Sequence, residues 1–124
     1  MSEKKNKTEK VNIIIVNYNC SRETMACVNS ILKSTYINYR IFIVDNNSTD
    51  NSINNILNWR KDINIVDSCN LQYKDKFKSN IIVVRHSHNN GFASGNNIVI
   101  RFLINQKEEE FIWLLNPDVI IEEE

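Results

Sequence analysis

Apolar residues in this chain form short, β-branched runs that alternate with segments of helical spacing. Such runs are typical of strands buried in a parallel sheet, and they span residues 11–16, 40–44, 81–85 and 111–115. Apolar positions three and four residues apart predict helices, over 22–33 with Ser21 as N-cap, over 53–59 and over 93–106. This alternation predicts an α/β fold whose parallel sheet is covered by helices on both faces.

The remaining segments are polar. Within 62–80, residues 63–66 offer a possible short strand, but the Lys-rich remainder predicts a surface insertion. Residues 107–110 are charged and are expected on the solvent side of the last helix. Residues 1–10 are charged without apolar periodicity and predict a flexible N-terminal lead-in.

Composition limits the class of protein. The chain has 124 residues, 42% of them hydrophobic, and 15 basic side chains balance 15 acidic ones. One domain with its own core is expected, and zero net charge argues against nucleic acid as a partner. Three scattered cysteines, Cys20, Cys27 and Cys69, predict a reduced, cytoplasmic protein. The apolar runs are about a quarter of the ~20 residues that span a bilayer, so no transmembrane segment is expected.

All four predicted strands end in polar residues. These are Asn17-Tyr18-Asn19, Asp45 and its loop, residues 86–95, and Asn116-Pro117-Asp118. Ligands of parallel sheets bind beyond the carboxyl ends of the strands. Either aspartate alone would be an ordinary turn or cap residue, but the four strand ends together predict a binding site.

Several common sites are excluded by sequence. No G-x-G-x-x-G follows the first strand, and neither glycine begins a P-loop. Residues 91–95 read G-F-A-S-G, which is not the G-x-S-x-G of a serine nucleophile. Dinucleotide binding, P-loop chemistry and serine hydrolysis are therefore not expected.

Four motifs resemble a known family: VNIIIVNYN (11–19), IVDNNSTDNS (43–52), NNGFASGNN (89–97) and WLLNPDV (113–119). In this order they resemble the N-terminal half of inverting family 2 glycosyltransferases. The resemblance implies a GT-A fold, a Rossmann-like three-layer sandwich with a mostly parallel sheet. It also implies that 11–124 form the nucleotide-sugar-binding part of a truncated transferase domain.

The resemblance assigns the nucleobase to the first two strand ends. Val16 and Tyr18 match the backbone and the aromatic side chain that hold the base. Asp45 matches the aspartate that accepts the imide N–H of uracil or thymine, and Asn46 begins the loop that supports it.

The sugar and diphosphate belong to the other two strand ends in this resemblance. Gly91 lets the backbone approach the donor, and Asn97 orients polar groups beneath the sugar. Asn116 and Asp118 match the D-x-D motif, so Asp118 would be the ligand of Mg²⁺ or Mn²⁺. The N-P-D form is similar to a branch that includes dTDP-dependent rhamnosyltransferases, so UDP and dTDP are both candidate nucleotides.

Two departures from the family pattern bear on function. A basic residue of the third loop has no clear counterpart, although Arg85, His86 and His88 are close to its position. The family's general base lies after the metal motif, and would be expected beyond Glu124. Residues 122–124 are expected to begin a helix.

We interpret the chain as half of a transferase that uses a UDP- or dTDP-sugar and a glycan or lipid-linked acceptor. The expected location is the cytoplasm, and the inner face of the membrane is a further candidate. One alternative is a truncated, inactive nucleotide-binding module. Another is a receiver-like α/β domain in which Asp45 is the receiver acid, although the acidic pair and the downstream Lys of such receivers are missing.

Overall fold

The computed structural model describes residues 10–72, 75–87, 91–106 and 110–121. Its elements follow in the order β1 (Val11–Asn17), α1 (Ser21–Leu32), β2 (Tyr39–Asn46), α2 (Ser52–Trp59), β3 (Ile63–Asp67), the short 3-10 helix η2 (Ser68–Asn70), β4 (Ile81–His86), α3 (Phe92–Gln106) and β5 (Phe111–Leu115). The α/β fold class is confirmed. The predicted lead-in, except Lys10, and the predicted helix start at 122–124 lie outside the described residues.

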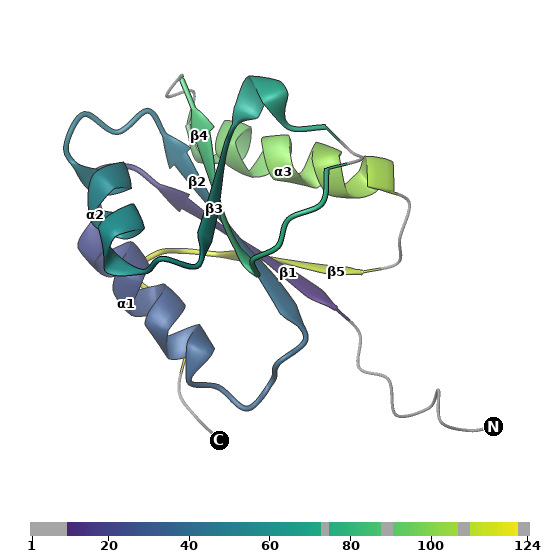
Figure 1. Cartoon of the computed structure of the whole chain (residues 1–124), viewed down its shortest axis with the longest axis horizontal. Helices are drawn as coiled ribbons and strands as arrows, with labels where there is room; N and C mark the ends of the chain where they lie inside the picture. The colour runs from purple at the N-terminus through teal and green to yellow at the C-terminus, as the bar shows by residue number, and fades with distance from the viewer. Residues whose placement is uncertain (1–9, 73–74, 88–90, 107–109, 122–124) are drawn as a thin grey trace.

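The five strands form one sheet in the order β3-β4-β2-β1-β5, and every pairing is parallel. Helices α1 and α2 pack on one face and α3 packs on the other, which gives three layers (Figure 1). The order places β1 and β2 in the interior of the sheet. The two strands whose ends carry Asn17 and Asp45 are therefore direct neighbours.

The core explains the continuous apolar runs. Successive side chains of a strand point to opposite faces, so Ile13 and Ile15 pack toward α1 and α2. Ile14 and Val16 pack toward α3. A strand covered on both faces is therefore apolar over most of its length.

The expected insertion at 62–80 is wrong in its first part. Residues Ile63–Asp67 form β3, which pairs with β4 at one edge of the sheet. The short strand considered for 63–66 is confirmed. An edge strand is only partly buried, so it needs few apolar residues, and its pattern is hard to distinguish from a loop.

The N-cap assigned to Ser21 is also wrong. Helix α1 begins at Ser21 itself, after Cys20, and its N-terminus has no side-chain capping hydrogen bond. The Ser21 hydroxyl instead accepts a hydrogen bond from Asn55 of α2 at 3.2 Å. A tertiary contact between the two helices takes the place of the predicted local one.

Strand β5 departs from the expectation of a sheet covered on both faces. Four of its side chains are 40–60% exposed, and only Leu115 is buried. The reason is topological, because among the described strands β5 pairs with β1 alone. The helices pack over the inner strands, where the two core clusters lie.

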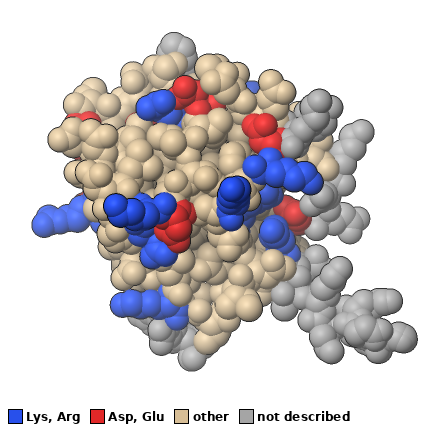
Figure 2. Space-filling model, in the orientation of Figure 1, with Lys and Arg blue, Asp and Glu red and all other residues tan. Residues whose placement is uncertain are grey.

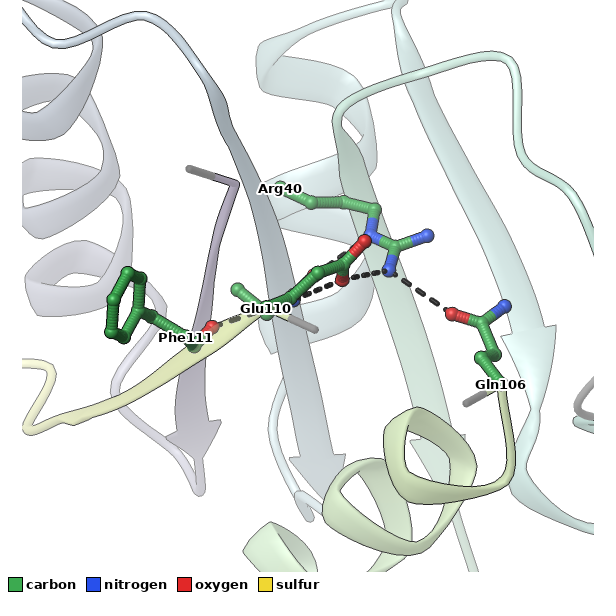
Figure 3. Close-up of polar contacts among 5 residues, drawn as sticks. Arg40, Gln106, Glu110 and Phe111 are labelled. Carbon is green, nitrogen blue, oxygen red and sulfur yellow. Dashed lines mark hydrogen bonds and ion pairs between the residues drawn. The ribbon is translucent and has the colours of Figure 1, made fainter. Parts of the chain in front are cut away.

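Glu110 does not lie on the solvent side, and the rest of 107–110 is outside the described residues. Its Oε1 accepts from Asn12 Nδ2 at 2.6 Å and from Arg40 Nη2 at 3.3 Å (Figure 3). Arg40 also donates to Asn12 at 2.9 Å and to Gln106 at 3.2 Å. This polar cluster joins β1, β2, α3 and the start of β5.

Charges elsewhere are distributed in small groups. On the face seen in Figure 1, several Lys and Arg side chains have an acidic side chain beside them (Figure 2). The described residues include two exposed ion pairs, Arg60 with Asp62 and Arg85 with Asp67. Within the described ranges, no helix has the length and apolar character needed to cross a membrane.

Glu110→Ala is expected to lower the free energy of unfolding by about 2 kcal/mol, because it removes the carboxylate shared by Arg40 and Asn12 at a partly buried site. The matched control is Asp62→Ala, since Asp62 pairs with Arg60 at 2.8 Å but is 57% exposed. That change should cost less than about 1 kcal/mol. Urea denaturation followed by circular dichroism measures both, and equal losses would contradict the structural role of Glu110.

Candidate functional site

Four polar residues form one row across the carboxyl ends of four strands. The register pairs Asn17 of β1 with Asp45 of β2, Asp45 with Arg85 of β4, and Arg85 with Asp67 of β3. Residues paired in this way point to the same face of a sheet. Here it is the face covered by α1 and α2, because Ile15, Ile43 and Val83, two residues earlier in their strands, pack there.

Asp45 is the most constrained member of the row, with 1% of its surface exposed. Its Oδ1 accepts hydrogen bonds from Asn17 Nδ2 at 2.8 Å and from the Ser48 hydroxyl at 2.7 Å. Its Oδ2 accepts from the Ser48 backbone N–H at 3.0 Å. An ionised carboxylate offers about four acceptor positions. Three are occupied by these donors, which leaves one on Oδ2.

Asn17 connects Asp45 to the first helix. It is completely buried, and its Oδ1 accepts a hydrogen bond from the Thr24 hydroxyl of α1 at 2.6 Å. Its amide nitrogen also approaches the Ser48 hydroxyl at 3.3 Å. The amide therefore fixes the orientation of the carboxylate from the side of β1.

Asn19 joins the loop after β1 to the loop after β2. Its Oδ1 accepts from the backbone N–H groups of Thr49 at 2.8 Å and Asp50 at 3.2 Å. Its backbone N–H donates to the Ser48 hydroxyl at 2.9 Å. Asn19 and Asn47 both have positive φ, 54° and 62°, which asparagine tolerates better than most residues. The two loops are thus held in one arrangement.

A cavity of about 450 Å³ opens beside this row. It is lined by Asp45, Asn47, Ser48, Ile53, Asp67, Ser68, Cys69, Arg85, His86 and Ser87. Arg85 Nε donates to Asp67 Oδ1 at 2.6 Å, and this hydrogen bond raises the pKa of the guanidinium. The Ser68 hydroxyl lies 3.1 Å from His86 Nδ1. The cavity therefore presents both carboxylate acceptors and a cationic donor.

The Asn116-Pro117-Asp118 turn lies above α1 after the end of β5. The Asn116 carbonyl accepts from the Val119 N–H at 3.1 Å and lies 3.9 Å from the Cys27 sulfur. Burial, together with the negative charge of Asp118, raises the pKa of the Cys27 thiol to about 11. Asn116 and Asp118 themselves are exposed. Their side-chain oxygens are open to a ligand.

These oxygens suit a hard divalent cation. Mg²⁺ in proteins is bound by one or two carboxylates together with substrate phosphates. Among the described residues, no group of three His, Cys, Asp or Glu side chains could hold a metal ion by itself. The donor set fits a cation that binds together with a diphosphate.

The other predicted site residues lie on the α3 side or at the surface. The side chain of Val16 is buried against Gly95 of α3, so only its backbone is available at the strand end. Asn46 donates through Nδ2 to the Gly91 carbonyl at 3.1 Å, and Gly91 has φ of +94°. Tyr18 is 42% exposed and does not line the cavity.

Asn97 is exposed on the outer side of α3, whereas its neighbour Asn96 is 2% exposed. Asn96 donates to the Phe92 carbonyl at 3.2 Å within the first turns of the helix. The structure thus turns Asn96, and not Asn97, toward the sheet.

The sequence placed Asn17 among the polar strand ends and Arg85 near the position of the family's basic residue, but it gave neither of them, nor Ser48 or Asp67, a role in the site. The signal for Asn17 and Arg85 was present, since each is a polar residue at the last or next-to-last position of an apolar run. Ser48 follows Asp45 by three residues, a spacing at which an aspartate can accept from a backbone N–H as it does at a helix N-cap. No sequence pattern indicated Asp67 as a site residue, because the segment that forms β3 was assigned to a surface insertion.

Asn17→Ala is expected to lower the free energy of unfolding by about 2 kcal/mol, because it leaves buried partners on Asp45 and Thr24 without the amide. Backbone N–H groups of Ser48 and Thr49 should then exchange faster with deuterium. The matched control is Asn29→Ala on the exposed side of α1, which should cost nothing and gain helix propensity. An unchanged exchange rate at the Ser48 N–H would contradict the role of Asn17 in holding the Asp45 carboxylate and its loop in place.

Comparison with known proteins identifies the family of this chain. The family model for glycosyl transferase family 2 matches residues 12–124. Glycosyltransferase GlyG of Streptococcus pneumoniae serotype 4 is 42% identical over 45 residues, which cover 36% of this chain and 15% of that protein.

Two solved structures share the fold. Mannosyltransferase PcManGT from Pyrobaculum calidifontis, in complex with GDP-Man and Mn²⁺, superposes with a TM-score of 0.68 at 16% identity. The match covers 93% of this chain and 29% of that one. S. aureus TarS 1-349 superposes with a TM-score of 0.60 at 21% identity, over 90% of this chain and 28% of that one.

The matched parts amount to less than a third of the length of each of these three proteins. The fold is the GT-A fold of glycosyltransferases, with all five described strands parallel. Since the family model matches nearly the whole sequence, the chain belongs to glycosyl transferase family 2.

Proposed function

We propose that residues 11–124 bind the donor of an inverting sugar transfer, a UDP- or dTDP-activated sugar, together with a divalent metal. The acceptor is a glycan or a lipid-linked sugar. The observation that carries the proposal is the buried Asp45 carboxylate, held by Asn17 and Ser48 at the wall of a cavity with one acceptor position open.

The open acceptor position favours a base with a single N–H on its recognised edge. Uracil and thymine carry one imide N–H between two carbonyl groups, whereas guanine carries two adjacent N–H donors. Only Oδ2 of Asp45 has an acceptor position left, because both positions of Oδ1 are used. The carboxylate can thus accept one N–H but not a bidentate pair.

The diphosphate is assigned to the turn after β5. Asp118, with Asn116 beside it, would hold Mg²⁺ or Mn²⁺, and the metal would neutralise charge on the two phosphates of the leaving group. The neighbour PcManGT was solved with GDP-Man and Mn²⁺, which supports metal use in this fold. The N-P-D sequence of 116–118 supports a rhamnosyltransferase-like branch.

The remaining contacts follow the positions of the strand ends. We assign the base to Tyr18, which directly follows β1, and to the backbone of Val16, the next-to-last residue of β1. Both lie next to Asn17, the register partner of Asp45. Gly91, joined to Asn46, lies where α3 begins and gives the sugar room, because no atom lies within 4 Å of the place of a Cβ. Asn97 remains the proposed sugar contact, although it is exposed.

Transfer with inversion needs a general base that deprotonates the acceptor hydroxyl. We assign no described residue to that role. The cellular site proposed for the protein is the cytoplasm, at the inner face of the membrane, where a lipid-linked acceptor is available.

Calorimetry with UDP, dTDP and Mn²⁺ tests the nucleotide site. Asp118→Asn is expected to weaken UDP binding at least about tenfold in Mn²⁺ while leaving uridine, which has no phosphate, unaffected. Asp45→Asn is expected to weaken uridine and UDP alike. Asp62→Asn is the control, because Asp62 lies outside the cavity in an exposed ion pair.

Binding of neither UDP nor dTDP by the wild-type chain would contradict the proposal. A chain that binds nucleotide sugars but releases no nucleotide in the presence of acceptors would instead favour the inactive nucleotide-binding module.

Cysteine labelling provides an independent test of the same cavity. Cys69 is exposed and lines the cavity, so UDP with Mn²⁺ is expected to slow its alkylation severalfold. Cys27 is an internal control, because its buried thiol has a pKa of about 11 and little thiolate at neutral pH. Mass spectrometry resolves the two sites. Equal rates at Cys69 with and without nucleotide would place the ligand elsewhere.

A further inference from the structure

We propose that a second cavity, between η2 and α3, binds a small organic anion that carries an apolar group. This inference goes beyond the proposed nucleotide function and does not depend on it. The cavity has a volume of about 350 Å³, at the small end of the range of about 300–1,000 Å³ that ligand sites occupy.

The segments that enclose this cavity are far apart in sequence but lie side by side (Figure 1). One wall is a single face of α3, because its lining residues are three or four positions apart. They are Ile98, Arg101, Phe102 and Asn105. The opposite wall is η2 and the residues directly after it. That wall ends in a turn, in which Asp75 accepts from the Gln72 N–H at 2.9 Å and donates to the Gln72 carbonyl at 2.8 Å.

Part of the wall is apolar and already packed. Phe102 is 5% exposed, and its ring lies edge-on to Phe42 with 5.9 Å between the ring centres. Leu71 and Ile98 are partly buried against the same core cluster. A ring or a short hydrocarbon chain bound here would lose its contact with water against side chains that the core holds in place. The apolar part of a ligand is therefore expected on this wall.

The charge of the cavity comes from Arg101. No described carboxylate lines the cavity, and Asp75, in the same loop, is not among the lining residues. Within the described part of the chain, no ion pair involves Arg101, whereas Arg40, Arg60 and Arg85 each have an acidic partner. An exposed guanidinium of this kind attracts carboxylate or phosphate oxygens, which it can bind through two N–H groups.

The other polar groups of the wall are neutral. They are the Ser68 hydroxyl and the amides of Gln72 and Asn105. A hydroxyl or an amide can donate or accept, so these groups can bond to an anion but do not select one. Arg101 makes that selection, and the apolar wall adds the second requirement. The ligand class is therefore a carboxylate or phosphate monoester attached to a ring or a short hydrocarbon chain.

Ser68 belongs to both cavities, since it also lines the one beside Asp45. The two cavities thus meet at η2, and a test must show which of them holds the ligand. Arg101 and Asn105 line only the second cavity, whereas Arg85 and Ser87 line only the first. The backbone N–H resonances of these residues separate the two locations.

The experiment titrates phenyl phosphate into the ¹⁵N-labelled chain in metal-free buffer without nucleotide, and NMR follows the amide resonances. We expect saturable shifts at Arg101 and Asn105, with a dissociation constant on the order of 1 mM for so small a molecule. Inorganic phosphate lacks the apolar group, and benzyl alcohol lacks the charge. Each is expected to bind at least about fivefold more weakly than phenyl phosphate.

Arg101→Met keeps the aliphatic stem and removes the charge, so it is expected to weaken phenyl phosphate about tenfold. Arg101→Lys should retain part of the affinity. The matched control is Arg22→Met, because Arg22 is exposed on α1 and does not line the cavity. That change should leave the affinity as it is. Circular dichroism of each variant shows whether the fold is kept.

No saturable shift at Arg101 and Asn105 would overturn the inference. Shifts confined to residues 85–87 would do the same, because they would place phenyl phosphate in the cavity beside Asp45. Equal affinity for inorganic phosphate and phenyl phosphate, or an unchanged affinity in Arg101→Met, would contradict the proposed ligand class. UDP binding is measured separately in Mn²⁺, so its failure would leave the result at this cavity unaffected.

Discussion

The buried hydrogen bond between the Asn17 amide and the Asp45 carboxylate is the interaction on which the site depends. A carboxylate with 1% exposure is costly unless its oxygens are paired. Asn17 supplies one donor and Ser48 two, and Ser48 is held in turn by Asn19. The loop after β2 is therefore shaped around a charge that the neighbouring strand stabilises.

The two sides of the candidate site differ in how many contacts their polar side chains make. On the side of β1 and β2, Asn17, Asp45 and Ser48 hydrogen-bond to one another at the wall of the cavity. On the side of β5, Asn116 and Asp118 are exposed, and no described cluster could hold a metal alone. The proposed base site therefore consists of residues that already contact one another, whereas the proposed metal site needs the phosphates of the donor.

The opposite end of the sheet has its own polar cluster. Arg40, Asn12 and Glu110 connect the starts of β2, β1 and β5, and Arg40 also lies 5.2 Å from the ring centre of Phe42. Because β5 has one neighbouring strand and exposed side chains, this cluster adds attachment that packing does not provide there. The hydrogen bonds of Glu110 thus hold the start of β5, the strand that precedes Asp118, against β1 and β2.

The sequence by itself determined the α/β class and the strands of the interior, because continuous apolar runs are local patterns. It also predicted the candidate site, with Asp45 in it, from the polar residues at the strand ends. Only the tertiary structure decided that Ser21 contacts α2 instead of capping its helix, and that residues 63–67 join the sheet. It also decided that Glu110 turns inward. The row that Asp45 forms with Asn17, Arg85 and Asp67 likewise depends on the tertiary structure. The physical reason is register: which side chains meet across a sheet depends on hydrogen bonds between strands that lie far apart in sequence, and no local pattern records them.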